Sequence, residues 1–349
     1  VTNAGGFGVL GALAYEPERL EIELKWIDEH VKGKPYGVDF AMPAKYVGQG
    51  GGEQATPEYL SSLIPAEHRE FVNKILDEAG IPPVPPDAGP RVPKAAGLNV
   101  DAEGPGQIEV TLSHPNVRMV VNALGPPPKY IVEKCHDAGV LVGGLVGSKQ
   151  HAERQLAIGT DVIVAQGTEA GGHCGEISTM VLVPQVVDAV GPDVPVLAAG
   201  GIADGRQAAA AMALGAQGVW TGSVWLLTQE ADLQPEVVEN LLAAQSRDAI
   251  RARVMTGKPA RQLRTKWTEA WERPDAPDPL PMPLQGLLYG EAAARFTRVH
   301  SKEFAGHPVG QIVGSLNKVR PAREVVLEMV QGWIEATERL SGLAGIKTD

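Results

Sequence analysis

The chain has 349 residues, 44% hydrophobic and 21% charged, which is typical of a globular protein with one large domain or two modest ones. Its 42 acidic residues outnumber 31 basic ones, and a net charge of -11 argues against a nucleic-acid partner. Only two cysteines occur, which favours a reducing compartment such as the cytoplasm, and no apolar run approaches the ~20 residues that span a bilayer. We therefore expect a small ligand or a protein partner, and no membrane.

From the start of the chain to about residue 228, short apolar runs alternate with helical patterns, as in parallel strands joined by crossover helices. The runs are apolar throughout, as expected of strands buried on both faces. Two helical patterns begin at an N-cap residue, Ser148 or Asp204, and end at a glycine, Gly159 or Gly215, before the next strand. The predicted strands cover 7–12, 36–42, 118–124, 140–146, 161–166, 194–200 and 218–222.

These strands predict an α/β fold, a TIM (β/α)8 barrel over residues 1–228 that lacks its first strand here, with that strand expected upstream of Val1. A doubly wound open sheet is the competing fold. A helical stretch at 57–79 precedes a Pro-rich excursion at about 81–110, where proline and glycine predict no regular structure.

The alternation of strands and helices stops after residue 228. Residues 229–307 are expected to form a helical substrate or cap domain over the barrel. Within the C-terminal segment 308–349, an amphipathic helix at about 321–341 is predicted to return to the barrel wall.

Glycines and hydroxyls follow the last two predicted strands. The first of these strands ends in Gly200 and Gly201, and the second ends in Thr221, Gly222 and Ser223. Bare glycines let a ligand approach backbone N–H groups, and the loops after strands seven and eight of a barrel commonly form one phosphate site. Either loop alone is explained equally well as a tight turn. As a pair they predict a phosphate site.

The stretch AQGTEAGGHCGE, residues 165–176, places His173 in a glycine-rich loop on the same face. Few apolar residues surround a histidine in such a loop, so a purely structural role is less expected. We expect His173 to act as a general base, a general acid or a hydrogen-bond donor. Glu169 and Glu176 either orient His173 or are solvated. No second histidine or cysteine lies at ligand spacing from Cys174, so no metal site is predicted.

Four segments resemble the nitronate monooxygenases, once called 2-nitropropane dioxygenases: NAGGFGVLGA (3–12), QGTEAGGHCG (166–175), AAGGIADG (198–205) and TGKPARQLR (256–264). The resemblance extends over nearly the whole chain and is weakest over 81–110. It implies an FMN-binding barrel with a small helical domain over the flavin. His173 then falls on the family's active-site histidine, Gln166 and Gly171 would contact the flavin, and Gly171 and Gly172 would let the backbone lie against it. The ribityl phosphate end would be held by Gly200, Gly201, Trp220, Thr221, Gly222 and Ser223.

One residue of the expected flavin site departs from the family. Asp39, in YGVDFAMPAKY, stands where the family usually has an asparagine that touches the flavin. A carboxylate beside the isoalloxazine disfavours its negatively charged reduced form, so we expect altered redox tuning.

The resemblance implies oxidation of a nitronate or nitroalkane by dioxygen to a carbonyl compound and nitrite, with His173 as base or as hydrogen-bond partner of the nitro group. Two relatives with the same loop, flavin-dependent NAD(P)H:quinone reductase and enoyl-acyl-carrier-protein reductase, are the alternatives. A non-catalytic flavin-binding barrel is a more distant one. The basic stretch 251–264 could attract a nitronate or the phosphates of NAD(P)H, or be a solvated face. A homo-oligomer is left open.

Overall fold

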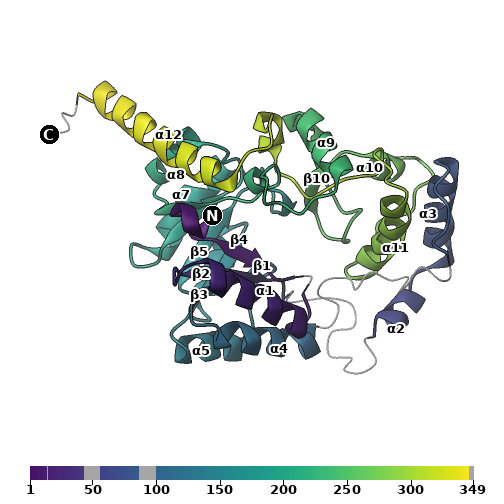
Figure 1. Ribbon diagram of the computed structural model, residues 1–349, viewed down its shortest axis with the longest axis horizontal. Coiled ribbons are helices and arrows are strands. Elements are labelled where there is room, and N and C mark those ends of the chain that lie inside the picture. The colour runs from purple at the N-terminus through teal and green to yellow at the C-terminus, as the bar shows by residue number, and fades with distance from the viewer. Residues whose placement is uncertain (14, 43–55, 86–99, 346–349) are drawn as a thin grey trace.

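The computed structural model describes residues 1–13, 15–42, 56–85 and 100–345, and its centre is one parallel sheet (Figure 1). The sheet has seven strands in the order β1-β2-β3-β4-β5-β7-β8, and all seven pair in parallel. Each predicted strand is present. The strands are β1 (Val9–Gly11), β2 (Tyr36–Phe40), β3 (Val117–Asn122), β4 (Leu141–Val146), β5 (Val162–Gln166), β7 (Val196–Ala199) and β8 (Gly218–Trp220).

This strand order distinguishes between the two predicted folds. A doubly wound sheet reverses its strand order at a switch point, whereas here each strand lies beside the one before it, as in a barrel wall. In the described part of the chain no pairing joins β1 to β8, so the sheet is a curled, open portion of that wall. The wall helices are α1 (Pro17–His30), α4 (Val100–Ser113), α5 (Lys129–Asp137), α6 (Lys149–Leu156), α7 (Thr179–Val190) and α8 (Gly205–Ala213).

The predicted helix caps are present in the structure. The Ser148 hydroxyl accepts a hydrogen bond from the His151 amide at the start of α6, and Asp204 forms a capping box at the start of α8. Gly159 and Gly215 follow these helices with φ of 91° and 101°, a conformation that favours glycine. The cap residues and glycines therefore determine where α6 and α8 begin and end, and where the chain turns into β5 and β8.

The excursion predicted at about 81–110 is partly wrong. Residues 86–99 lie outside the described residues, but α4 begins at Val100, inside the stretch expected to be irregular. Ile108 of α4 is fully buried in the core cluster that also holds Leu20 and Leu24 of α1. Burial against α1 therefore outweighs the low helix propensity of the Gly and Pro residues.

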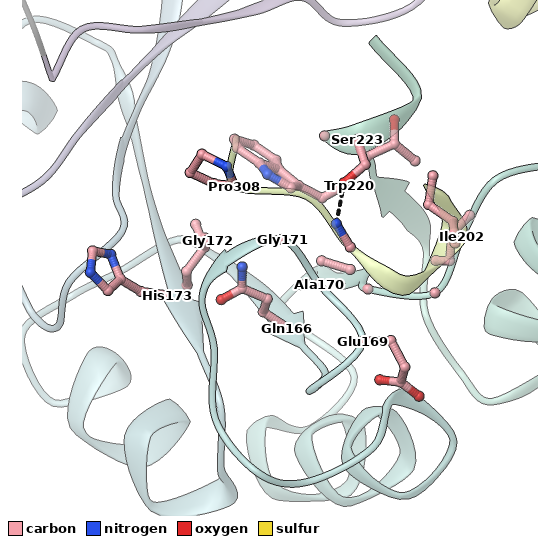
Figure 2. A pocket seen from close by; sticks show the side chains of 18 of the residues that line it. Gln166, Glu169, Ala170, Gly171, Gly172, His173, Ile202, Trp220, Ser223 and Pro308 are labelled. Carbon is pink, nitrogen blue, oxygen red and sulfur yellow. Dashed lines mark hydrogen bonds between the residues drawn. The ribbon is translucent and has the colours of Figure 1, made fainter. Parts of the chain in front are cut away.

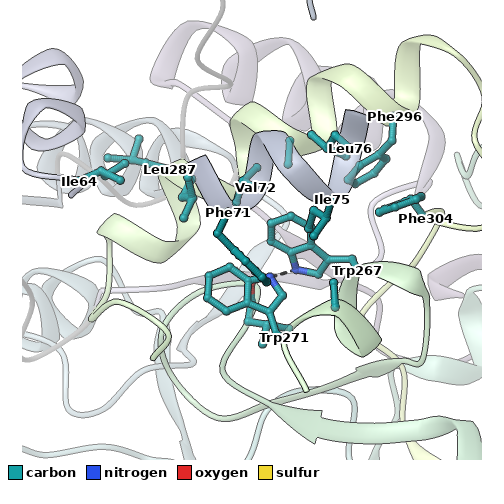
Figure 3. Packing of buried hydrophobic residues seen from close by; sticks show 14 of the residues in the cluster. Ile64, Phe71, Val72, Ile75, Leu76, Trp267, Trp271, Leu287, Phe296 and Phe304 are labelled. Atoms are coloured by element: carbon teal, nitrogen blue, oxygen red, sulfur yellow. Dashed lines mark hydrogen bonds between the residues drawn. The ribbon is translucent and has the colours of Figure 1, made fainter. Parts of the chain in front are cut away.

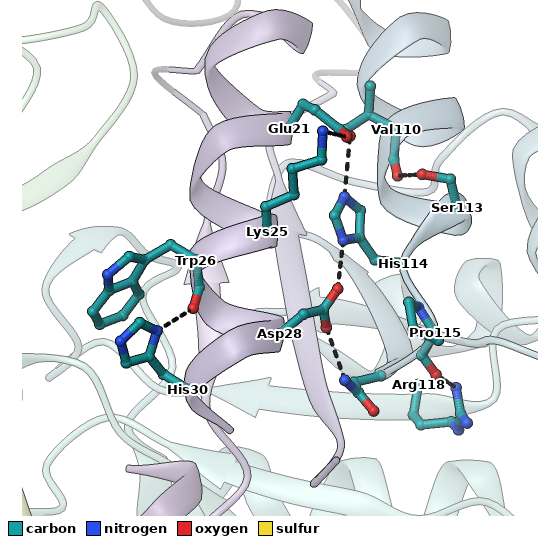
Figure 4. Close-up of polar contacts among 11 residues, drawn as sticks. Glu21, Lys25, Trp26, Asp28, His30, Val110, Ser113, His114, Pro115 and Arg118 are labelled. Carbon is teal, nitrogen blue, oxygen red and sulfur yellow. Dashed lines mark hydrogen bonds and ion pairs between the residues drawn. The ribbon is translucent and has the colours of Figure 1, made fainter. Parts of the chain in front are cut away.

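A buried charge cluster also ties α1 to the chain that follows α4 (Figure 4). The His114 ring contacts carboxylates through both nitrogens, with Nδ1 2.6 Å from Asp28 Oδ2 and Nε2 3.1 Å from Glu21 Oε2. The Asn116 amide donates to the other oxygen of Asp28. Since His114 is only 7% exposed, these contacts compensate for burying its polar ring.

A second hydrophobic core lies away from the sheet and holds a helical unit together (Figure 3). Trp267 and Trp271 pack there with Phe71 of α3, and the Trp267 ring nitrogen donates to the Val254 carbonyl at 3.1 Å. The unit thus combines a segment from between β2 and β3 with segments that follow β8, and α2 and α3 belong to it although they lie within 1–228. Its helices are α2 (Pro57–Ser62), α3 (Ala66–Glu78), α10 (Lys266–Ala270) and α11 (Leu284–Arg298).

The region 229–307 is not entirely helical, which corrects the sequence prediction. It contains α9 (Pro235–Ala243) and two strands, β9 (Ala249–Ala252) and β10 (Ala260–Leu263). Both pair antiparallel in a small sheet whose third strand is β6 (Gly172–His173), from the glycine-rich loop. Strands this short carry too little periodicity to be recognised in a sequence.

The last helix, α12 (Ala322–Leu343), lies against α8, and its far end projects from the body (Figure 1). The two backbones are so close that a Cβ on Gly205 would lie 2.1 Å from the Trp333 nitrogen. No helix among the described residues is long and apolar enough to cross a membrane. The division into a barrel, a cap and a C-terminal segment stays a prediction.

Candidate active site

A cavity of about 560 Å³ lies at the carboxyl edge of the parallel sheet (Figure 2). The ends of all seven strands reach it, from Gly11 of β1 to Trp220 of β8. Its volume is in the range of pockets that enclose small ligands and cofactors. Every residue predicted for the site lines it: Asp39, Gln166, Gly171, Gly172, His173, Gly200, Gly201, Trp220, Thr221, Gly222 and Ser223.

Several glycines line this cavity with backbone alone. A Cβ on Gly11, Gly172 or Gly222 would meet no atom within 4 Å, although all three residues line the cavity. The walls there are therefore bare backbone, which a flat ring or a phosphate can approach closely. The residues present thus fit a flavin nucleotide.

One end of the cavity offers backbone donors. The amides of Gly201, Gly222 and Ser223 have no hydrogen-bond acceptor within the described part of the chain. The Ser223 hydroxyl accepts from the Gly310 amide at 2.8 Å, which leaves its own hydrogen free for a ligand. Asp204 occupies the first amides of α8, so the helix end itself is not the donor as the sequence suggested. The loop amides are the groups available to a phosphate.

The glycines of the stretch 165–176 have separate structural reasons. A Cβ on Gly167 would lie 2.0 Å from the Thr179 hydroxyl, and one on Gly171 would lie 2.7 Å from the Gly310 nitrogen. The close approach of the chain at 309–310 therefore requires glycine at 171, and the expected flavin contact of this cavity-lining residue stays a prediction. Gly172 has φ of 74° and an open side, so it fits the expected close approach to a flavin.

His173 is held at the opposite end of the cavity from Ser223 (Figure 2). Its backbone pairs with Ala260 of β10, which fixes the loop to the chain that follows the main sheet. The ring Nε2 lies 2.7 Å from the Thr256 hydroxyl oxygen. Thr256 therefore fixes the ring orientation and leaves Nδ1 without a protein partner in the described structure.

Burial, together with the nearby Lys258 ammonium, lowers the pKa of His173 to about 4. The ring is consequently uncharged at neutral pH. A neutral imidazole donates through one nitrogen and accepts through the other, so the hydrogen bond to Thr256 determines what Nδ1 can do.

Asp39 lies at the carboxyl end of β2, opposite Gly11 of β1 in the sheet register. Its Oδ1 is buried without a hydrogen-bond partner, and burial raises the pKa of the carboxyl to about 7. The group lines the cavity, so a ligand donor could satisfy that oxygen. An asparagine at this position would keep the shape of the side chain and remove the ionisable group.

The acidic residues of the loop do not orient His173. The Glu169 carboxylate accepts from both the amide and the hydroxyl of Thr179 at the start of α7, and Glu176 pairs with Arg251 at 3.4 Å. Cys174 is buried, and its thiol donates to the Thr168 carbonyl. Among the described residues no group of three or more His, Cys, Asp or Glu side chains could hold a metal ion.

The basic stretch 251–264 mostly has structural partners. Arg261 is buried and donates to the carbonyls of Thr168 and Ala249, which joins the glycine-rich loop to β9. Arg253 donates to the Gly257 carbonyl. Lys258, in contrast, has no ion pair in the described structure and lines a cavity next to His173.

The sequence patterns do not indicate two contributors to this site. Thr256 was quoted only as part of a family-like segment, and the chain at Pro308–Gly310 was assigned to a returning segment, yet both reach the cavity or its histidine. Thr256 lies two residues before Lys258, in the turn between two short strands. No local pattern indicates that this turn lies against residue 173.

Fold and site together define a class of protein: an α/β-barrel enzyme whose cavity, at the carboxyl edge of a parallel sheet, fits a flavin nucleotide beside a partly buried, neutral histidine. The nitronate monooxygenase family model matches residues 1–332, and the chain belongs to that family. It is an oxidoreductase with a flavin cofactor, and its reaction class is the flavin-dependent oxidation of nitro compounds.

Individual relatives agree with the family assignment. A Mycobacterium tuberculosis protein, named provisionally as a monooxygenase, is 53% identical over 351 residues, which are 98% of this chain and 92% of that protein. The nitroalkane oxidase of Streptomyces ansochromogenes is 26% identical with a TM-score of 0.77, covering 98% of this chain and 92% of the other. FabK of Thermotoga maritima is 25% identical with a TM-score of 0.69, covering 98% and 89%.

Proposed function

We propose that the protein binds FMN and oxidises alkyl nitronates with dioxygen to a carbonyl compound and nitrite. The observation that carries this proposal is the arrangement of one cavity, with free amides and the Ser223 hydroxyl at one end and His173 at the other. The free amides suit the FMN phosphate, and in this proposal the flavin ring would lie toward Gln166 and Gly172. When bound, the flavin accepts the electron that the nitronate loses.

His173 acts here as a hydrogen-bond partner of the nitro group. A group with a pKa of about 4 is a weak base at neutral pH, and a nitronate arrives without the proton that a base would remove. In our assignment the Thr256 hydroxyl donates to Nε2, so Nδ1 carries the hydrogen and donates it to a nitronate oxygen. Lys258 adds positive charge near the same ring.

The experiment is an aerobic assay of nitrite release from a nitronate and from the matching neutral nitroalkane, with the flavin content measured in each sample. We expect nitrite from the nitronate and a loss of about 100-fold in kcat/KM for His173→Ala with FMN retained. His173→Asn keeps an N–H donor and should recover part of the loss. Absence of nitrite from flavin-loaded wild-type protein would refute the proposed reaction.

The reductase alternatives make a different prediction for the same preparation. They require NAD(P)H to reduce the flavin at the rate of turnover, whereas nitronate oxidation by dioxygen does not. An assay of the purified protein depends neither on its oligomeric state nor on its cellular compartment.

A further inference from the structure

A second cavity of about 370 Å³ adjoins the first one. Ala123, Leu145, Gln166 and His173 line both, so the two spaces meet at the candidate reaction centre. The second cavity extends from there to α6 and to the turn between β9 and β10. A ligand in it can place one end against His173 while its other end reaches the surface, where His151 and Arg154 are exposed.

We call this second cavity the basic cavity, because its charged side chains are cationic. Two cationic side chains, Arg154 and Lys258, line it together with His151, and no aspartate or glutamate does so among the residues that the structure describes. The protein as a whole has 42 acidic and 31 basic residues, so a lining with cations and no carboxylates is opposite to the general trend. A concentration of positive charge of this kind attracts anions.

The cations are also not engaged by other groups. Neither Arg154 nor Lys258 forms an ion pair in the described structure. Two acidic residues that adjoin lining residues in the sequence are paired with other cations, Glu153 with Lys149 at 3.9 Å and Glu176 with Arg251 at 3.4 Å. Lys258 is partly buried without a compensating charge, and this burial lowers its pKa. An anion in the cavity would supply the missing partner.

We propose that the basic cavity binds a phosphate group of a substrate or cosubstrate larger than a small nitronate, with the reacting end of that molecule at His173. Phosphate fits because the planar guanidinium of Arg154 suits two of its oxygens and the Lys258 ammonium adds a point charge. This site is separate from the FMN phosphate end, which lies at Gly222 and Ser223 across the first cavity. Coenzyme A and NADPH both carry such phosphates.

The test is calorimetric titration of the FMN-loaded protein, so that the flavin site is filled, with coenzyme A and with NADPH in separate experiments. We expect at least one probe to bind, and Lys258→Gln and Arg154→Gln each to weaken that binding about tenfold or more. Lys258→Arg should retain it. Lys149→Gln is the matched control, because it removes the same charge from α6 outside the cavity.

Binding of coenzyme A alone would identify a thioester-carrying substrate, and binding of NADPH alone would identify a nicotinamide cosubstrate. Either result supports the phosphate site. The proposal is overturned if neither probe binds, or if the cavity variants and Lys149→Gln weaken binding equally. This inference goes beyond nitronate oxidation, because calorimetry requires no turnover: protein that releases no nitrite but binds a probe through Lys258 would refute the proposed reaction alone.

Discussion

The Nε2 nitrogen of His173 lies 2.7 Å from the Thr256 hydroxyl, although 83 positions separate the two residues in the chain. Thr256 sits in the turn between β9 and β10, and β10 pairs with the two residues of β6 that include His173. The small antiparallel sheet therefore aligns the histidine with its partner. Thr256 is a positioning residue in this account, because it acts on a substrate only through the ring.

Replacing Thr256 tests that relationship. Thr256→Val keeps the shape but removes the hydroxyl, so the ring can adopt the tautomer with Nδ1 unprotonated. We expect kcat with a nitronate to fall about 10-fold to 100-fold with FMN retained, and Thr256→Ser to restore most of it. Steady-state kinetics with separate kcat and KM values provides the measurement. Equal loss in the serine variant would show that the residue acts through packing alone.

The pKa of His173 can be measured directly by NMR titration of the histidine rings in flavin-loaded protein. We expect one ring to titrate near pH 4 and its signal to be absent from His173→Asn. Lys258→Gln should raise this pKa, because the lysine charge is one of its two causes. If the assigned ring titrates near the unperturbed value of about 6.5, His173 is not desolvated as described.

Asp39 should make stability depend on pH. Because its pKa is raised to about 7, the folded protein keeps a proton that the unfolded chain loses above about pH 4, so stability falls as pH rises between these values. Asp39→Asn removes this decline and should stabilise the protein by about 2 kcal/mol at pH 8 relative to wild type. Urea unfolding at pH 5 and pH 8 measures it. The exposed Asp193→Asn is the control, and a matching effect there would contradict the assignment.

The buried cluster around His114 should contribute measurably to stability (Figure 4). His114→Ala removes the ring contacts of Asp28 and Glu21, which keep Asn116 and Lys25 as partners, at a cost of about 2 kcal/mol. The comparison is His136→Ala, whose ring is 40% exposed beside Asp161 and should cost less than about 1 kcal/mol. Chemical denaturation of both variants gives the difference. Similar losses would mean that burial does not distinguish the two pairs.

The α8–α12 contact is predicted to tolerate no side chain at Gly205. Gly205→Ala places a Cβ against the backbone of Trp333, which should destabilise the protein by about 3 kcal/mol. Gly342→Ala in α12 meets no atom within 4 Å and should stabilise the helix by about 0.5–1 kcal/mol. Thermal unfolding separates the two outcomes. A neutral effect of Gly205→Ala would show that the helices are further apart than described.

The strands, the barrel order and the glycine-bearing strand ends could be predicted from sequence because they are local. Apolar runs bounded by caps such as Ser148 and Asp204 determine them, and the carboxyl ends of parallel strands necessarily meet at one edge. His173 follows β5 and lines the cavity at that edge for the same reason. The strand order does not determine the chemical role of each residue in the site.

What the sequence did not reveal depends on contacts between distant segments. β6 has only two residues, so nothing local predicts its pairing with β10 or the contact of Thr256 with His173. The need for glycine at 171 arises from residues 309–310, far along the chain. Similarly, α2 and α3 have helical patterns, but their core around Trp267 is supplied by the second half of the chain.

The most direct test of the central claim is anaerobic mixing of the flavin-loaded protein with a nitronate and, separately, with NADH, followed by flavin absorbance in a stopped-flow instrument. We predict that the nitronate reduces the flavin at least as fast as nitrite is released in air, and that NADH reduces it far more slowly. Flavin reduction by NADH at the rate of turnover, with no reduction by the nitronate, would contradict the proposed function.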